Sequence, residues 1–280
     1  MMTIFTSLFI FFFTFASLCA SNRVDRHGPS IRSEKQKRCN LKELGEEYQV
    51  DKVNIFHNYQ ILYCELLKPI RHNHIKLLEI GFGCGHHVHG QSCLMWNAFF
   101  SHLTYYAVDF MDENSKERVT SCVDNFQKEN AGKLEKIWLG DQSKPSFLAS
   151  IIREYGVNNT FDVIIDDGGH RYEQQLESFK ALWPAVTDGG LYIVEDMAMD
   201  HTFSKLVSMW MQKIGSGSQT GRKSLDILEG IPTGVSIMGC SFQICYFRKV
   251  LPSQDELPKI WGENYDVDMT SSSNTTQSLI

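Results

Sequence analysis

The sequence predicts an α/β fold built on a doubly wound, mostly parallel sheet. Short apolar segments alternate along the chain with segments of helical periodicity, which is the order expected when helices cross between parallel strands. The centres of these apolar segments carry few polar residues, as in strands that helices cover on both faces. Polar motifs rich in glycine and acids follow several of them, at the strand ends where such sheets bind ligands.

Each element can be placed in order from hydrophobic periodicity and turn residues. Strands are expected over 75–80, 104–110, 135–140, 161–166 and 189–196, with a late strand over 241–249. Helices are expected over 56–67, 92–100, 117–130, 147–155, 172–186 and 203–214.

Both ends of the chain are expected to lie outside this fold. Residues 1–20 are apolar, carry no charged side chain and end in small residues, which favours a secretory signal peptide cleaved after Ala20. The alternative is an uncleaved membrane anchor, which the basic stretch after it would orient with the catalytic domain in the cytosol. Residues 21–40 read as a basic linker, 41–250 as the folded domain and 251–280 as a polar tail.

Composition narrows the classes of partner. The 280 residues carry a net charge of −6, and no continuous basic run suggests nucleic acid as a partner; the basic stretch from Arg23 to Arg38 is expected to be a solvated linker. Seven of the eight cysteines lie beyond residue 20 and lack zinc-like paired spacing. We expect most of them to be buried free thiols, with one or two disulfides as the alternative; Cys240 and Cys245 lie close together in a strand-like region.

The first strong motif is LEIGFGCG, a strand followed by a glycine turn. Gly81, Gly83 and Gly85 let the backbone turn sharply and approach a ligand closely. A dinucleotide fingerprint needs its third glycine one residue later, where His86 stands, so the loop fits S-adenosylmethionine better than NAD. Glu79, within the strand, is included among the candidate cofactor residues. A purely structural turn is the alternative.

Polar residues at the next two strand ends extend the cofactor site. Asp109 could accept hydrogen bonds from both ribose hydroxyls, or could instead cap a helix or face solvent. Asp141, Gln142 and Ser143 could contact the adenine edge, although Asp141 could simply cap the helix that follows.

Acidic pairs end the fourth and fifth strands. Asp166 and Asp167 end one, and Glu195 and Asp196 end the next. Four converging acids repel one another unless a cation neutralises them, and oxygen ligands suit Mg²⁺, with Mn²⁺ or Ca²⁺ as alternatives. His170 follows closely and could serve as a general base. The competing interpretation is that some of these acids cap helices in solvent.

Together these motifs resemble a known family, the metal- and S-adenosylmethionine-dependent O-methyltransferases of the macrolide-sugar (mycinamicin and tylosin) type. The resemblance covers roughly Leu41 to Lys249, and its carriers in chain order are DKVNIFHNYQILY, LLEIGFGCG, GQSCLMWNAFF, AVDF, GDQS, FDVIIDDGGH and GGLYIVEDM. It implies a Rossmann-like class I methyltransferase fold, with the methyltransferase domain at 41–250. It also implies that Asp167, Glu195 and Asp196 hold the metal, that His170 is the base, and that Gly81, Asp109 and the GDQS residues hold the cofactor; Asp166 is grouped with the cofactor residues.

The resemblance has departures. The family usually has serine where Gly169 stands, and CGHHVHG is inserted after Gly83, so that His87 and His89 could bind a metal of their own or belong to a solvent loop. The expected partner is a small hydroxylated acceptor, such as a sugar or natural product, and a homo-oligomer is a further expectation. The alternatives are a metal-dependent hydroxylase-like or hydrolase-like enzyme, or a non-catalytic secreted protein with this fold.

Overall fold

The structure is a computed structural model that describes residues 38–85, 89–156, 160–197, 201–215 and 234–249. The expected leader at 1–20, nearly all of the basic linker and the tail at 251–280 lie outside these residues, as does His87. No helix in the described ranges combines the length and the apolar character needed to cross a bilayer.

A seven-stranded sheet forms the centre of the domain, in the order β3-β2-β1-β4-β5-β7-β6. The five expected strands are present and parallel: β1 (His74–Ile80), β2 (His102–Asp109), β3 (Lys136–Leu139), β4 (Phe161–Asp166) and β5 (Val186–Val194). They confirm the predicted doubly wound α/β fold. β1 and β4 lie side by side and parallel, with Ile80 opposite Asp166, and the strand order of the sheet changes direction between them.

The late strand is a hairpin that the sequence reading described only in part. β6 (Val235–Ser241) and β7 (Ile244–Lys249) are antiparallel, and β7 also pairs antiparallel with β5. The expected strand over 241–249 therefore joined the end of one strand to the next. Gln243, with φ of 60°, lies in the turn between them.

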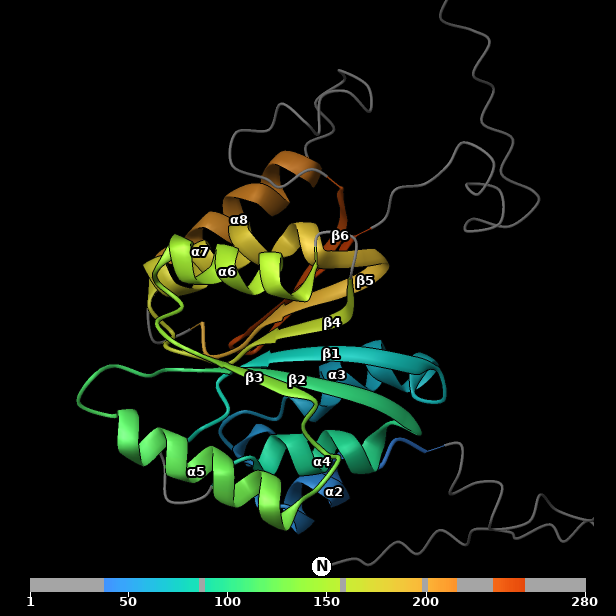
Figure 1. The fold of residues 1–280 in the computed structure, drawn as a ribbon. Coiled ribbons are helices and arrows are strands. Elements are labelled where there is room, and N and C mark those ends of the chain that lie inside the picture. Colours follow the sequence, from blue (N-terminus) through green and yellow to red (C-terminus); the bar gives the residue numbers. More distant parts are fainter. Residues whose placement is uncertain (1–37, 86–88, 157–159, 198–200, 216–233, 250–280) are drawn as a thin grey trace, which may run out of the picture. The chain divides into compact units, whose positions relative to one another are not determined.

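Helices cover both faces of the sheet (Figure 1). One face carries α2 (Leu41–Glu47), α3 (Gln60–Leu67), α4 (Gln91–Phe99) and α5 (Lys116–Glu129). The other carries α6 (Pro145–Tyr155), α7 (Tyr172–Leu182) and α8 (His201–Gly215). Short 3₁₀ turns are η1 (Asp51–Val53), η2 (Lys68–Ile70) and η3 (Trp183–Ala185).

The helix expected from residue 56 begins later than predicted. It starts at Gln60, because the preceding residues form a turn in which Asn54 Oδ1 accepts hydrogen bonds from the backbone N–H groups of Phe56 and His57. This turn carries His57 to the site described below.

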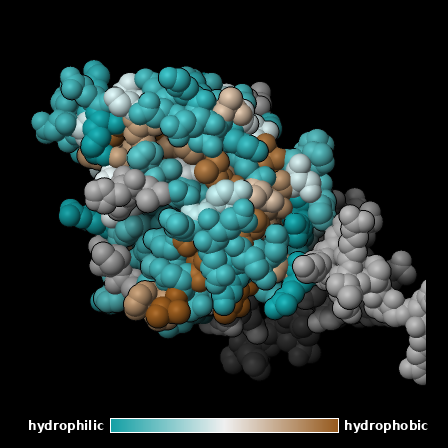
Figure 2. All heavy atoms as spheres, turned by 90° about the horizontal axis from the view of Figure 1, so that it is seen from below, coloured by the Kyte–Doolittle hydropathy of each residue, from teal (hydrophilic) through white to brown (hydrophobic). Residues whose placement is uncertain are grey.

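Two apolar cores lie on opposite faces of the sheet. Leu77 belongs to one core and Leu78 to the other, because successive side chains of a strand point to opposite faces. Burial on both faces explains why the strand segments are almost wholly apolar. The face drawn in Figure 2 is mostly hydrophilic, with smaller hydrophobic areas between.

The expectation of mostly free thiols is wrong. Three disulfides join Cys39 to Cys64, Cys84 to Cys122 and Cys240 to Cys245, and Cys93 is a buried free thiol. Two of the pairs are 25 and 38 residues apart in sequence, so local patterns could not reveal them.

Candidate active site

A cavity of about 780 Å³ opens at the carboxyl ends of the parallel strands. This is the edge where ligands bind in open parallel sheets. Its lining joins the glycine loop, the ends of β2 and β4, and residues 49–52 at the start of η1. The lining residues include Gln49, Lys52, Gly81, Gly83, Gly85, Asp109, Gln142, Asp167, Gly169, His170 and Asp196.

The glycine loop passes directly over the end of β4. Gly81 has φ of 104°, and a Cβ atom at this position would lie 2.0 Å from the backbone oxygen of Asp167. A side chain is therefore excluded by both backbone conformation and space. Gly83 also has positive φ, whereas a Cβ at Gly85 would meet nothing within 4 Å.

Asp109 is fixed at the rim of the cavity. Its Oδ2 accepts a hydrogen bond from the backbone N–H of Cys84 at 2.8 Å, and its Oδ1 accepts one from Phe110 at 2.9 Å. Burial raises the pKa of Asp109, while these backbone donors oppose the shift. The structure thus ties the end of β2 to the glycine loop, as the cofactor prediction requires.

The GDQS residues divide into two roles. Gln142 lines the cavity, donates from Nε2 to Asp166 Oδ1 at 3.1 Å, and accepts the Gly169 N–H at 2.9 Å. Asp141 does not cap α6; its carboxylate accepts from the backbone and hydroxyl of Ser143 in a local turn. Of this motif, Gly140 and Gln142 line the cavity, whereas Asp141 and Ser143 do not.

Asp166 is buried beneath the cavity rather than exposed in it. Its other oxygen accepts from the Tyr192 hydroxyl at 3.3 Å. Burial raises the pKa of Asp166 to about 7, and the hydrogen bonds from Gln142 and Tyr192 only partly offset this. Its contacts position Gln142.

Lys52 is the cation at the centre of the acidic group. Its side chain is 2% exposed, and Nζ lies 2.5 Å from Asp167 Oδ2, 2.8 Å from Glu195 Oε2 and 3.3 Å from Glu79 Oε1. Burial alone would lower the pKa of Lys52, but these three carboxylates hold it well above its usual value.

Glu195 and Glu79 are both enclosed by donors. Glu195 accepts from the hydroxyl of Tyr63 as well as from Lys52, and burial raises its pKa. Glu79 accepts from Ser92 at 2.7 Å and from Tyr105 at 2.5 Å. Neither acid is free in solvent, so the helix-capping interpretation does not describe Glu195.

Asp167, His170 and Asp196 form a second group at the cavity wall. One potential ligand atom from each lies within 4.8 Å of the others. His170 Nε2 is 3.5 Å from Asp196 Oδ2, and Tyr59 donates to Asp196 Oδ1 at 2.6 Å. His57 Nδ1 lies 3.2 Å from the same oxygen.

This group overlaps the predicted metal ligands without repeating them. Asp167 and Asp196 are present as expected, and His170 lies beside them where Glu195 was expected. Glu195, which directly precedes Asp196 in the sequence, instead accepts hydrogen bonds from Lys52. The assignments of Glu195 as a ligand and of His170 as a base stay predictions.

Sequence reasoning missed the donors that surround these acids. Lys52, His57, Tyr59 and Tyr63 all come from DKVNIFHNYQILY, a segment noted only for its family resemblance. Tyr59 and Tyr63 lie four residues apart and so share one face of a helix. That spacing, after an isolated lysine, was the available signal.

Comparisons with known proteins agree with this architecture. A family described as "Methyltransferase domain" matches residues 78–197. The chain is 35% identical over 159 residues to mycinamicin VI 2''-O-methyltransferase of Micromonospora griseorubida, and 34% identical over 161 residues to demethylmacrocin O-methyltransferase of Streptomyces fradiae. Each match covers 56% of this chain, which spans only 36% of either relative.

A solved structure shows the same likeness. The MycE methyltransferase of the mycinamycin biosynthetic pathway, in complex with Mg, SAH and mycinamycin VI, superposes with a TM-score of 0.58 at 25% identity. The alignment covers 77% of this chain and 56% of that one. These findings confirm the expected resemblance and the Rossmann-like class I fold.

Proposed function

Because residues 78–197 match a methyltransferase domain, we propose that this chain transfers a methyl group from S-adenosylmethionine to a hydroxyl oxygen of a small acceptor, assisted by a divalent cation. One observation carries the proposal: a single cavity joins the glycine loop and Asp109 to the group of Asp167, His170 and Asp196.

The cavity suits S-adenosylmethionine. Its volume of about 780 Å³ is in the range of sites for small ligands and cofactors, roughly 300–1,000 Å³. The bare backbone at Gly81 and Gly83 allows close approach. The Asp109 carboxylate has about four acceptor positions, of which the backbone N–H groups of Gly83, Cys84 and Phe110 occupy three, so one is left for a ribose hydroxyl.

The donor set suits a hard divalent cation. Carboxylate oxygens favour Mg²⁺ or Mn²⁺ over softer metals. Asp167 and Asp196 would hold the cation, with Glu195 as the predicted third ligand. A cation bound there would lower the pKa of a nearby acceptor hydroxyl. MycE, solved with Mg and SAH, supports this choice.

His170 would take the hydroxyl proton. Its Nε2 faces the cavity wall near Asp196, whose carboxylate stabilises the imidazolium that forms. Tyr59 holds Asp196 in place by its hydrogen bond. The acceptor oxygen forms its new bond to the methyl carbon as the bond from carbon to sulfur breaks, which leaves S-adenosylhomocysteine. Positioning of the two reactants supplies much of the rate gain.

For the acceptor we propose a sugar hydroxyl. Relatives are named mycinamicin VI 2''-O-methyltransferase and demethylmacrocin O-methyltransferase, and two others are named for rhamnosyl and olivosyl compounds, which supports a sugar oxygen as the methylated atom. The relatives favour methyl transfer over the hydroxylase-like and hydrolase-like alternatives. The homo-oligomer expected from the sequence stays a prediction, which light scattering of the purified chain would test.

We also propose that the protein enters the secretory pathway. Three disulfides among seven cysteines are typical of an oxidising compartment and uncommon in the cytosol. Mass spectrometry of the natural protein should find a mature N-terminus near Ser21. An intact Met1 in a membrane fraction would support the anchored alternative with a cytosolic domain.

The reaction is tested with S-adenosylmethionine that carries a trideuterated methyl group. The protein is incubated with a panel of sugars and glycosides bearing vicinal hydroxyls, in Mg²⁺ or in excess EDTA. We expect the label on an acceptor oxygen in Mg²⁺ and little or none in EDTA. Equal labelling in both conditions would contradict the role of the metal, and label on nitrogen or carbon would contradict O-methyl transfer.

A further inference from the structure

One face of α5 holds the glycine loop at three points. Arg118, Cys122 and Phe126 are spaced four residues apart and therefore lie along one side of the helix. Arg118 donates a hydrogen bond to the backbone oxygen of Cys84, and Cys122 forms a disulfide with Cys84. The ring of Phe126 packs edge-on against Phe82, with centroids 4.9 Å apart.

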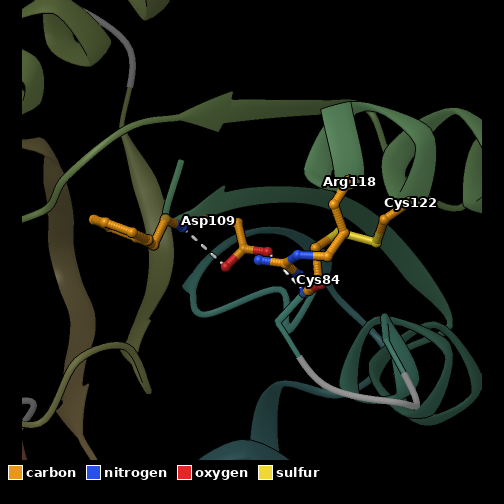
Figure 3. The surroundings of a disulfide bond; sticks show 5 residues. Cys84, Asp109, Arg118 and Cys122 are labelled. Atoms are coloured by element: carbon orange, nitrogen blue, oxygen red, sulfur yellow. Dashed lines mark hydrogen bonds between the residues drawn. A yellow bond between two sulfur atoms is a disulfide. The ribbon is translucent and has the colours of Figure 1, made fainter. Parts of the chain in front are cut away.

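Cys84 is consequently fixed through every polar or reactive group that it has. Its N–H donates to Asp109, its oxygen accepts from Arg118, and its sulfur is bonded to Cys122 (Figure 3). Both cysteines are buried, at 3% and 6% exposure, so the bond lies inside the fold.

The residues on either side of Cys84 have no side chains with which to hold the loop. Gly83 and Gly85 flank Cys84, line the cavity, and carry no side chains that could pack. Glycine has the largest conformational freedom to lose on ordering, so a loop of this composition gains most from an external constraint. A ligand that binds a preordered loop avoids that ordering cost.

We propose that the Cys84–Cys122 disulfide is a positioning element of the cofactor site, which holds the glycine loop in the shape that binds S-adenosylmethionine. This inference rests on the proposed function. It gives the bond a role beyond general stability, and it couples the oxidation state of one cysteine pair to cofactor affinity.

The test compares two double variants by calorimetry with S-adenosylmethionine. Cys84→Ala/Cys122→Ala removes the proposed bond, and Cys240→Ala/Cys245→Ala removes the hairpin disulfide as the matched control. We expect affinity to fall roughly tenfold in the first variant and to stay at the wild-type value in the second. Equal affinity of all three proteins would overturn the proposal.

Hydrogen exchange supplies a readout that needs no cofactor. The amides of residues 83–85 should exchange faster in Cys84→Ala/Cys122→Ala, while those in the centre of β4 keep their wild-type rates. Unchanged exchange in the loop would also overturn the proposal. A wild-type chain that binds no S-adenosylmethionine would instead refute the proposed function, and the exchange rates would still report on the loop.

If the first variant does not fold, the folded wild-type protein is reduced with dithiothreitol. The reagent gives two electrons and two protons to the bond, leaves two thiols and closes to its own cyclic disulfide. Mass spectrometry of alkylated peptides identifies the opened pair. We expect weaker cofactor binding once Cys84 and Cys122 are free thiols, and unchanged binding would overturn the inference.

Discussion

Lys52 is the residue that lets three neighbouring acids coexist, two of which are buried. Its ammonium group contacts Asp167, Glu195 and Glu79, and removal of one partner from a buried ion pair leaves uncompensated charge. We expect Lys52→Met to lower the free energy of unfolding by about 3–5 kcal/mol, measured by urea denaturation at pH 7.

The control for Lys52 is Lys180, which pairs with Glu177 on the surface of α7. Lys180→Met should change the unfolding free energy by no more than about 0.5 kcal/mol, because exposed ion pairs contribute little. If both variants lose the same stability, Lys52 does not have the role assigned to it.

Asp166 should give the protein a measurable pH dependence. Burial raises the pKa of Asp166 to about 7 in the folded protein, against an ordinary value of 3.8 when unfolded. Between these values the folded state binds more protons, so Asp166 favours folding at low pH and opposes it as pH rises towards 7. The amide of Asp166→Asn does not titrate, so the variant does not lose this stability as the pH rises.

The stability difference between Asp166→Asn and wild type should therefore shift in favour of the variant from pH 4 to pH 7, then level off. The full shift is at most about 4 kcal/mol, since each pKa unit corresponds to about 1.36 kcal/mol. Urea denaturation of both proteins at each pH measures it. If the stability difference does not depend on pH, the pKa of Asp166 is not raised in the folded protein.

His170 should affect turnover more than binding. We expect His170→Ala to keep S-adenosylmethionine affinity but to lose turnover by roughly 10²–10⁴, the usual contribution of a positioned acid–base group. Its residual rate should rise with pH as hydroxide replaces the missing base. Wild-type turnover would refute the base assignment, whereas loss of metal binding would identify His170 as a ligand or support.

The acids and glycines of the site could be predicted from the sequence, but the central lysine, Lys52, could not. Asp167 and Asp196 were readable because they directly follow apolar strands. Lys52 was not, because its partners Asp167 and Glu195 lie 115 and 143 positions away and only the folded chain brings them together.

At the scale of elements, Gly81 lies directly after β1, where the backbone passes close to the end of β4. Gly132, between α5 and β3, is a matched control because it also has positive φ but an added Cβ would meet nothing within 4 Å. We expect Gly132→Ala to cost about 1 kcal/mol, the penalty of the backbone conformation alone. Gly81→Ala should cost about 1–3 kcal/mol more, because its Cβ meets the Asp167 backbone.

Thermal or urea denaturation of both glycine variants measures the difference between them. If Gly81→Ala and Gly132→Ala lose equal stability, the close approach of the loop to β4 does not constrain the residue at 81.

The alternation of strands and helices was strong enough to predict the parallel part of the sheet. The edges of the elements were less readable. The late hairpin was merged into one strand because β6 and β7 are separated only by a short turn at 242–243. The start of α3 was placed too early, because the Asn54 turn, which depends on side-chain hydrogen bonds, precedes it.

At the scale of the whole molecule, disulfides hold together segments that are far apart in the sequence. Two disulfides fix segments that border the site: Cys39–Cys64 ties the start of the domain to α3, and Cys84–Cys122 ties the glycine loop to α5. Neither pairing follows from sequence periodicity, because each depends on the packing of helices against the finished sheet.

The central claim is that the carboxyl edge of this sheet binds S-adenosylmethionine through the glycine loop and Asp109. Calorimetry in Mg²⁺ tests it with wild type, Asp109→Ala and Asp112→Ala, an exposed acid in the loop that follows β2. We predict saturable binding of one cofactor per chain, weakened by about 1.5–3 kcal/mol in Asp109→Ala and unchanged in Asp112→Ala. No binding by wild type, or equal affinity of wild type and Asp109→Ala, would contradict the account.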